Sequence, residues 1–310
     1  MVVREGRVAP ITRSTYQKEG SQMKRVACLS VLLLTSTIGV LMVATSRSKA
    51  ITYGFVDSNN TYSNAGAFIV KSPTTGNIFP ICSGTMITSN VFLTASHCTV
   101  FYDRELAPQG FTAYVSLDSS IPFGPLTSSK TKLLPVSYVV TNPNFNQSQS
   151  DSGDIAVLIL RSGVHGVTPA TLPSCGVLDQ LGAQNELKNA VFTAVGYGVQ
   201  NRVVGGGVPY FQDLNPIPRM YAFSSFNSLN GGYIRLSQNP STGNGGTCFG
   251  DSGGPNFFDV NGQQILMAIT ITGDSVCRST NVDYRVDTAS AQAFFTYVNA
   301  AYGVAIPIIC

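Results

Sequence analysis

Short segments rich in Val, Ile, Thr, Phe and Tyr recur along residues 51–310 and are separated by Gly, Pro, Asn and Ser. No long stretch of this region places apolar residues at the 3.6-residue spacing of an amphipathic helix. Segments of this kind, with turn residues between them, are typical of β-sandwiches and β-barrels. We therefore expect an all-β fold. The clearest segments are GAFIV, MITSNVFLTAS, FTAYVSL, SYVVTN, DIAVLIL, AVFTAVGYG, GGYIRLS and QILMAITITG.

One segment near the end of the chain differs from this pattern. Residues 287–303, with the sequence DTASAQAFFTYVNAAYG, are compatible with an amphipathic helix. Asp287 stands at the start of this segment, where an N-cap residue is favoured. We expect a single C-terminal helix here.

Residues 1–50 have a different composition from the rest of the 310-residue chain. Two basic residues precede an apolar run over residues 26–44, and the segment ends in small residues up to Ala50. A basic start, an apolar middle and a small-residue end form a secretory signal. We expect cleavage after Ala50 and a secreted domain over residues 51–310, either extracellular or periplasmic. Cleavage after Ala44 or Ser46 would instead leave a short pro-segment that needs a second cut. The alternative is a retained membrane anchor, because residues 26–44 are just long enough to span a bilayer.

The formal charge of +3 comes from this N-terminal segment. The first 50 residues hold eight of the 19 Lys and Arg residues but only two of the 16 Asp and Glu residues, which leaves the remainder weakly acidic at −3. The remainder contains no basic stripe that would follow a phosphate backbone. We therefore expect no nucleic-acid partner.

The cysteines of the expected mature domain are even in number. An even count in an exported domain is typical of disulfides, and fifteen pairings are possible from the sequence alone. The alternative is a metal site, but CxxC-like spacing and grouped histidines are both missing. We expect disulfides and neither a metal nor an organic cofactor. The six residues are Cys82, Cys98, Cys175, Cys248, Cys277 and Cys310.

The segment GTCFGDSGGP, residues 246–255, contains a serine between glycines, Ser252. Clusters of Gly, Ser and Asp are most often simple turns. A catalytic serine needs a neighbouring base, and the chain has only two histidines, His97 and His165. Residues 250–254 also fit the G-x-S-x-G elbow of α/β-hydrolase esterases, but in that fold the histidine follows the serine. No histidine follows Ser252, so its base has to come from upstream.

His97 is the better candidate for that base. It follows a β-like run and directly precedes Cys98, where a disulfide would fix its backbone, whereas His165 lies in a loop-like segment. Asp154 begins the apolar segment DIAVLIL, where a buried carboxylate needs a polar partner. We expect Asp154 to orient His97, with Asp151 as the competing candidate.

The motifs LTASHC, DIAVLIL and GDSGGP, in this order, resemble those of the trypsin/chymotrypsin-like serine endopeptidases. The resemblance extends over residues 51–310 and suggests a secreted, bacterial-type member. It implies two six-stranded antiparallel β-barrels with the catalytic residues in the cleft between them, and we place the seam near residues 165–185. It assigns His97, Asp154 and Ser252 to a catalytic triad.

The same resemblance assigns further roles. The N–H groups of Gly250 and Ser252 would form the oxyanion hole. A new amino terminus at Ile51, exposed by signal cleavage itself, would pair with Asp251. The resemblance implies the disulfides Cys82–Cys98 and Cys248–Cys277. The two cysteines that remain would form the third, Cys175–Cys310.

The primary substrate pocket would be formed by Gly246, Thr247 and Gly273. Gly246 stands where trypsin-like enzymes carry aspartate, which argues against a simple specificity for Lys or Arg side chains. Asp274 and Asp283 are candidates to enter the pocket. The family implies a monomer that acts on protein or peptide substrates, with protein protease inhibitors as further candidate partners. The alternative is a non-catalytic binding protein with the same fold, although such proteins typically lose a triad residue.

Overall fold

The computed structural model describes residues 51–126, 131–146, 148–200, 202–203, 210–211 and 214–309. These residues belong to one of the two units into which the chain divides, Arg47–Cys310. The expected signal within residues 1–50 and the last cysteine, Cys310, lie outside the described residues.

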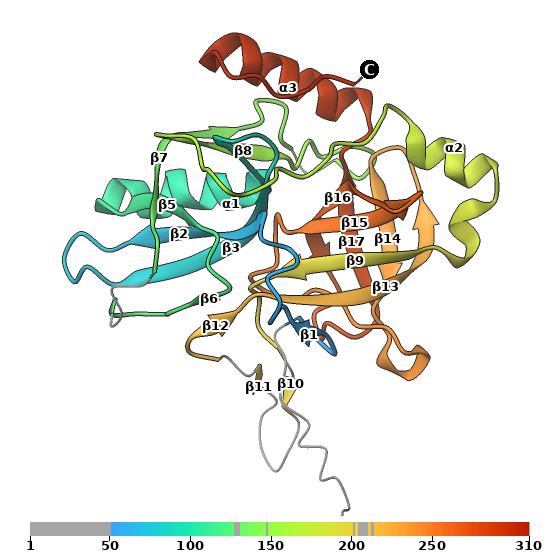
Figure 1. Cartoon of the computed structure of the whole chain (residues 1–310), viewed down its shortest axis with the longest axis horizontal. Coiled ribbons are helices and arrows are strands. Elements are labelled where there is room, and N and C mark those ends of the chain that lie inside the picture. The colour runs from blue at the N-terminus through green and yellow to red at the C-terminus, as the bar shows by residue number, and fades with distance from the viewer. Residues whose placement is uncertain are drawn as a thin grey trace, which may run out of the picture. The chain divides into compact units, whose positions relative to one another are not determined.

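Six antiparallel strands of the N-terminal half close into a barrel, in the ring order β2-β3-β4-β8-β7-β5 (Figure 1). Its strands are built from the β-branched and aromatic segments of the sequence, which favour a pleated, half-buried backbone. Phe68, Phe92 and Leu158 are among the side chains buried together in this half. The strands are β2 (Ala65–Lys71), β3 (Ile78–Met86), β4 (Val91–Thr94), β5 (Thr112–Ser116), β7 (Leu134–Thr141) and β8 (Ala156–Leu160).

A second antiparallel barrel follows, in the order β13-β14-β17-β16-β15-β9. It closes because the first half of β13 pairs with β9 and its second half pairs with β14. A short strand, β1 (Phe55–Val56), adds to the edge of β13. The prediction of two six-stranded antiparallel barrels is confirmed. The strands are β9 (Val191–Gly196), β13 (Met220–Leu229), β14 (Tyr233–Ser237), β15 (Pro255–Val260), β16 (Gln263–Gly273) and β17 (Thr280–Arg285).

Helix α3 (Ala289–Tyr302) follows the last barrel strand, so the prediction of a C-terminal helix is confirmed. Its N-cap is Thr288, whose hydroxyl accepts the N–H of Ala291, and the expectation that Asp287 caps this helix is wrong. Asp287 is instead buried and accepts hydrogen bonds from the guanidinium of Arg285. A carboxylate buried this deeply needs a charged partner, which takes precedence over capping.

Short elements connect the barrel strands. Among the described residues, no helix is long and apolar enough to cross a membrane. The short elements are α1 (Ser96–Phe101), α2 (Val177–Ala183), η1 (Tyr102–Leu106), η2 (Ala107–Gln109), η3 (Glu186–Asn189), η4 (Pro240–Thr242), β6 (Ser120–Ile121), β10 (Arg202–Val203), β11 (Tyr210–Phe211) and β12 (Ile217–Pro218).

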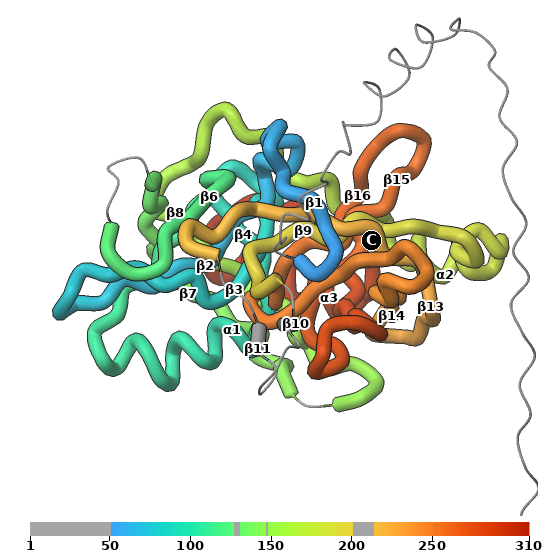
Figure 2. The backbone as a smooth tube through the Cα atoms, turned by 90° about the horizontal axis from the view of Figure 1, so that it is seen from below, coloured from blue at the N-terminus to red at the C-terminus, as the bar shows by residue number. Residues whose placement is uncertain are grey.

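One hydrophobic cluster joins the two barrels and α3. Leu93 and Val157 contribute from the first ring, Leu266 from the second, and Phe295 from the helix. The two rings lie side by side, with α2 on the outer side of the second ring (Figures 1 and 2). The expected seam at residues 165–185 lies in the connection between β8 and β9. The residues of the candidate site lie at strand ends in both rings. The packing of one ring on the other therefore determines how close these strand ends lie.

A buried ion pair ties the start of the described chain to the second barrel. Arg219, directly before β13, donates its Nε–H to Asp57 Oδ2 at 2.9 Å, and both side chains are buried. Its other N–H groups bond to Asn60, to the Tyr197 hydroxyl and to backbone carbonyls of the first half of the chain. A charge this deep is tolerated only when it is paired and fully hydrogen-bonded, so Arg219 links three separate segments.

Replacing Arg219 with leucine should lower the free energy of unfolding by about 3–5 kcal/mol, because Asp57 would be left as an unpaired buried charge. Asp179→Asn is the control. That carboxylate also bonds to a buried arginine, Arg285, but it is 66% exposed, so we expect a loss below about 1 kcal/mol. Urea unfolding at neutral pH measures both variants, and equal losses would contradict the assignment.

Candidate active site

His97 and Asp154 lie at the ends of two neighbouring strands of the first barrel. β4 ends at Thr94, and His97 lies in the first turn of α1. Asp154 stands just before β8, which pairs with β4 through Thr94 and Ala156. Strand pairing therefore brings together two side chains that are 57 positions apart in the sequence.

Two contacts join these residues. Asp154 Oδ2 lies 2.8 Å from His97 Nδ1, and Asp154 Oδ1 accepts the His97 backbone N–H at 2.9 Å. The carboxylate side chain is 9% exposed and the imidazole 36%. The contacts hold the ring with Nδ1 toward Asp154, so Nε2 is left on the opposite side of the ring, and His97 lines an open hollow.

The rival candidates lie elsewhere. Asp151 Oδ1 accepts hydrogen bonds from the Tyr284 hydroxyl at 2.8 Å and from the Gly153 N–H at 3.0 Å. His165 is exposed in the loop that follows β8. The structure thus brings His97 to Asp154 and not to Asp151.

Ser252 lies in a turn of the second barrel that packs against the first. Its backbone C=O accepts the N–H of Ser83 in β3 at 2.8 Å, and Cys98 Sγ in α1 lies 4.0 Å from the same oxygen. Gly253 has φ +79°, and an ideal Cβ there would be 2.2 Å from Thr94 Oγ1. Only glycine permits so close an approach, which places the turn beside the start of α1.

The side chains of Ser252 and His97 open onto hollows that share a wall. Ser252 lines a hollow of about 340 Å³. Ile271 and Thr272 of β16 line both this hollow and the one beside His97. The two side chains thus lie along one wall, and no hydrogen bond joins Ser252 to His97 among the described residues.

The turn before Ser252 presents two amide donors. The Phe249 C=O accepts the Val199 N–H at 2.8 Å, so across this trans peptide the Gly250 N–H points to the other side. Gly250 adopts φ +96°, which favours glycine. In the described part of the chain, the N–H groups of Gly250 and Ser252 have no protein acceptor. They are therefore available to an oxygen bound beside the turn.

Asp251, between these donors, is fully buried. Its Oδ1 accepts the Gly198 N–H and its Oδ2 the Cys248 N–H, each at 2.8 Å. Burial raises the pKa of Asp251 to about 7, although these two hydrogen bonds favour the carboxylate. No cation among the described residues pairs with it.

Ile51 is also fully buried, against Met220 and Ala222 of β13. Its C=O accepts the Gly54 N–H, and the next residue, Thr52, forms an antiparallel bridge with Gly246. Because the chain is uncut here, the Ile51 nitrogen is a neutral amide. The expected ion pair between Ile51 and Asp251 is not among the contacts of the described residues.

Two of the expected disulfides are present, Cys82–Cys98 and Cys248–Cys277. The first connects β3 to α1, next to His97, and the second connects the Ser252 turn to the segment after β16. Cys175 is also disulfide-bonded, and its expected partner Cys310 lies outside the described residues. Cys82, His97 and Cys98 are grouped closely enough to hold a metal, but both sulfurs are consumed in a disulfide and offer no thiolate.

Thr247 and Gly273 line the hollow beside the candidate nucleophile, and so does Asp274. Gly246 does not line it: an ideal Cβ at Gly246 would be 2.2 Å from Gln238 Oε1, so Gln238 fills the adjoining space. Burial tends to raise the pKa of Asp274, but hydrogen bonds from backbone amides and from Gln238 bring it below its usual range. The hollow thus carries an ionised carboxylate.

A buried polar network lies behind this hollow. Asp283 Oδ1 accepts hydrogen bonds from Asn256, Asn281 and the Thr270 hydroxyl, and Asn281 Oδ1 accepts the Thr247 hydroxyl at 2.6 Å. Burial raises the pKa of Asp283 to about 8 against these hydrogen bonds. Burial thus favours the protonated form of Asp283, which lies behind the wall and does not line the hollow itself. Sequence reasoning missed the network because strand register alone brings its members together.

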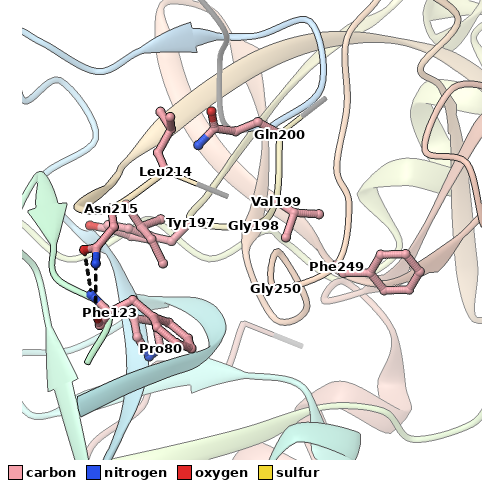
Figure 3. A pocket seen from close by; sticks show the side chains of 11 residues that line it. Pro80, Phe123, Tyr197, Gly198, Val199, Gln200, Leu214, Asn215, Phe249 and Gly250 are labelled. Carbon is pink, nitrogen blue, oxygen red and sulfur yellow. Dashed lines mark hydrogen bonds between the residues drawn. The ribbon is translucent and has the colours of Figure 1, made fainter. Parts of the chain in front are cut away.

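A third hollow, of about 330 Å³, lies beside the Gly250 turn (Figure 3). Pro80 and Phe123 line one side of it, and Leu214 and Gln200 line the other. These residues come from segments that are distant in the sequence, so no sequence motif indicates the hollow.

Comparisons with known proteins identify similar sequences. The sequence model of the trypsin family matches residues 55–295. Chymotrypsin-like elastase family member 1 of the dog, Canis lupus familiaris, is 28% identical over 232 residues, which cover 72% of this chain and 82% of that protein. His97, Asp154 and Ser252 all lie within the matched range of the family model, whereas Ile51 precedes it.

Asp251 and Asp283 should make the stability of the uncut chain fall as the pH rises. Both carboxyls have an ordinary pKa of 3.8 and a folded-state pKa of about 7 and about 8, respectively, so each binds its proton more tightly in the folded chain. This stabilisation is complete below the ordinary pKa and is lost as the pH rises from about 4 to 8. We expect each group to lower the free energy of unfolding by roughly 1 kcal/mol per pH unit within its window.

Asp283→Asn tests this directly, because the amide keeps an oxygen acceptor and does not titrate. Urea unfolding at one-unit intervals from pH 4 to pH 8 should give a shallower decline for this variant than for the wild type. Asp259→Asn, at an exposed position, is the control and should leave the profile unchanged. An Asp283→Asn profile as steep as that of the wild type would contradict the assignment.

Proposed function

This chain belongs to the trypsin family of serine proteases, and from that premise we propose that it is a serine endopeptidase. The observation that carries the proposal is the two-point contact of His97 with Asp154, next to the turn that holds Ser252. Proteases of this family act on protein or peptide substrates, and we assign this chain the same class. Non-catalytic members typically lose a triad residue, whereas this chain keeps all three.

In the proposed reaction the Ser252 hydroxyl attacks the carbonyl carbon of the scissile peptide bond, and its proton moves to His97 Nε2. Asp154 accepts the Nδ1–H, which holds the required tautomer and stabilises the imidazolium that forms. The N–H groups of Gly250 and Ser252 donate to the developing oxyanion. The carbon–nitrogen bond then breaks, the amine leaves with the proton from His97, and an acyl ester remains on Ser252.

Water completes the cycle. His97 removes a proton from the water molecule as it attacks the ester carbonyl, and the same proton then returns to Ser252 Oγ. The acid is released and the starting state is restored. These roles are those of the family's triad, carried over to His97, Asp154 and Ser252.

We assign the hollow lined by Thr247 and Gly273 to the substrate side chain that precedes the scissile bond. Gly246 contributes no charge, so a simple Lys or Arg preference is not expected. Asp274 supplies a carboxylate to the same hollow. Cleavage of a peptide library would define which side chains this combination accepts.

We assign export to residues 1–50 and peptidase activity to residues 51–310. Trypsin-family proteases are typically secreted, and the disulfides Cys82–Cys98 and Cys248–Cys277 suit an oxidising compartment. An enzyme that retained residues 26–44 would be anchored to the membrane with the same domain outside the cytoplasm.

The processed enzyme is proposed to pair the free amine of Ile51 with Asp251. Ile51 is fully buried and adjoins Thr52, whose bridge partner Gly246 begins the segment that leads to Asp251. An ammonium group beside this carboxylate would favour its charged form and lower the pKa of Asp251 from about 7. Signal cleavage after Ala50 would then complete the site in one step.

A fluorophosphonate probe tests for an activated serine. We expect the secreted wild type to be labelled, and Ser252→Ala and His97→Ala to lose labelling by more than about 1,000-fold, because nucleophile and base act as a unit. His165→Ala, at an exposed loop position, is the matched control and should label as the wild type does. A folded wild type that begins at Ile51 and stays unlabelled would overturn the proposal and favour a binding protein.

Mass spectrometry of the secreted, active protein should identify Ile51 as its first residue. Protein extended by Ala50 should label more slowly than protein that begins at Ile51, because its terminal amine is displaced from Asp251. Asp251→Asn in the processed protein should reduce labelling for the same reason. An active form that begins elsewhere would contradict the pairing of Ile51 with Asp251.

A further inference from the structure

Ser83 of β3 is fully buried and holds a hydroxyl that bridges two segments of the second half of the chain. Its Oγ donates to the Gly250 C=O at 2.9 Å and accepts the Tyr197 N–H at 3.0 Å. Ser83 also lies next to Cys82, whose disulfide partner is Cys98. One position of the first barrel is thus tied both to the turn after β9 and to the turn that carries the candidate oxyanion donors.

The backbone of Ser83 makes further contacts to the same region. Its N–H donates to the Ser252 C=O at 2.8 Å, and its C=O accepts the Thr94 hydroxyl at 2.8 Å. Ser83 therefore holds the carbonyls of Gly250 and Ser252, on both sides of Asp251. The hydroxyl is the only one of these groups that a substitution can remove while the backbone contacts stay.

We propose that the Ser83 hydroxyl is a positioning group: it holds the peptide group that follows Gly250, and by limiting rotation at this glycine it keeps the Gly250 N–H directed toward the substrate oxyanion. The inference rests on the proposed function, because it assigns a role in that reaction to a residue outside the triad. Ser83 touches neither substrate nor the reacting atoms in this assignment and acts only through the peptide groups of Gly250.

Two peptide planes meet at Gly250, and separate hydrogen bonds hold each of them. The preceding plane is held by the Val199 N–H, which donates to the Phe249 C=O. The following plane is held at its C=O by Ser83 Oγ and at its N–H by the Cys248 C=O, which accepts the Asp251 N–H at 3.0 Å. A glycine with φ +96° has few steric limits on rotation between these planes. Without the Ser83 hydroxyl, the Gly250 C=O loses its partner and so does the Tyr197 N–H, and both would seek new ones.

The consequence for catalysis is specific to the transition state. An oxyanion donor is effective only when it lies about 2.7–3.1 Å from the position the charged oxygen will occupy. A rotated Gly250 N–H weakens that contact but leaves the hollow beside Thr247 and Gly273 unchanged. We therefore expect a loss in kcat with KM preserved.

The test uses the processed enzyme beginning at Ile51, with active-site concentration measured by burst titration. For Ser83→Ala we expect kcat on a peptide amide to fall by about 10-fold to 100-fold, less than the loss of a complete donor, with KM within about twofold of the wild type. Binding of a peptide aldehyde, whose hemiacetal oxygen would take the oxyanion position, should weaken by a similar factor.

Thr85→Val is the matched control, because Thr85 is a fully buried residue of the same strand whose hydroxyl also donates to a backbone carbonyl, that of Asn64. Its kcat and aldehyde affinity should equal those of the wild type. Ser83→Gly is a second variant without the hydroxyl, and it tests the inference if Ser83→Ala fails to fold.

Each outcome supports or overturns the positioning role of Ser83. A kcat for Ser83→Ala or Ser83→Gly equal to that of the wild type, or a rise in KM with kcat preserved, would overturn the positioning role while leaving the peptidase proposal intact. A loss of kcat as large in Thr85→Val would reduce the effect to general destabilisation and would also overturn it. A wild type without activity would remove the proposed function and this inference together.

Discussion

The geometry of the site depends on the buried carboxylate of Asp251. It lies between the amides of Gly198 and Cys248, in a space that exists because Gly196 and Gly198 carry no side chain. An ideal Cβ at these glycines would fall 2.1 and 2.4 Å from the carboxylate oxygens. The carboxylate thus connects the turn that contains Ser252 to the turn after β9, and so fixes the position of Ser252 and its neighbouring amides.

Apolar and polar contacts have different effects at the junction of the barrels. The shared hydrophobic cluster of the two rings and α3 provides a large but non-directional attraction. Direction comes from a few hydrogen bonds, among them those that Ser83 makes to Gly250 and Ser252. A small error in register would leave these buried groups unpaired at a cost of about 1–3 kcal/mol each, which favours one arrangement of the rings over its neighbours.

The barrels and the family could be predicted because the sequence features that indicate them are local. β-rich segments between turn residues report the preference of the backbone, and the resemblance rests on contiguous motifs. The helix cap was misassigned by one position, since Asp287 and Thr288 are both favoured N-cap types and the buried partner of Asp287 decided between them. The contacts of Ser83, Arg219 and Asp283 carry no local signal, because their partners become neighbours only when the rings close.

For the proposed endopeptidase, closure of both rings affects how easily one copy of the protein can be cut by another. A second copy can cut only backbone that it can bind in an extended, accessible form, and each of the twelve barrel strands already has a neighbour on both sides. Withdrawing a strand would break two ladders at once, whereas the connections between strands can open locally at much lower free energy. The working lifetime of such a molecule would then be set by its loops and not by its barrels.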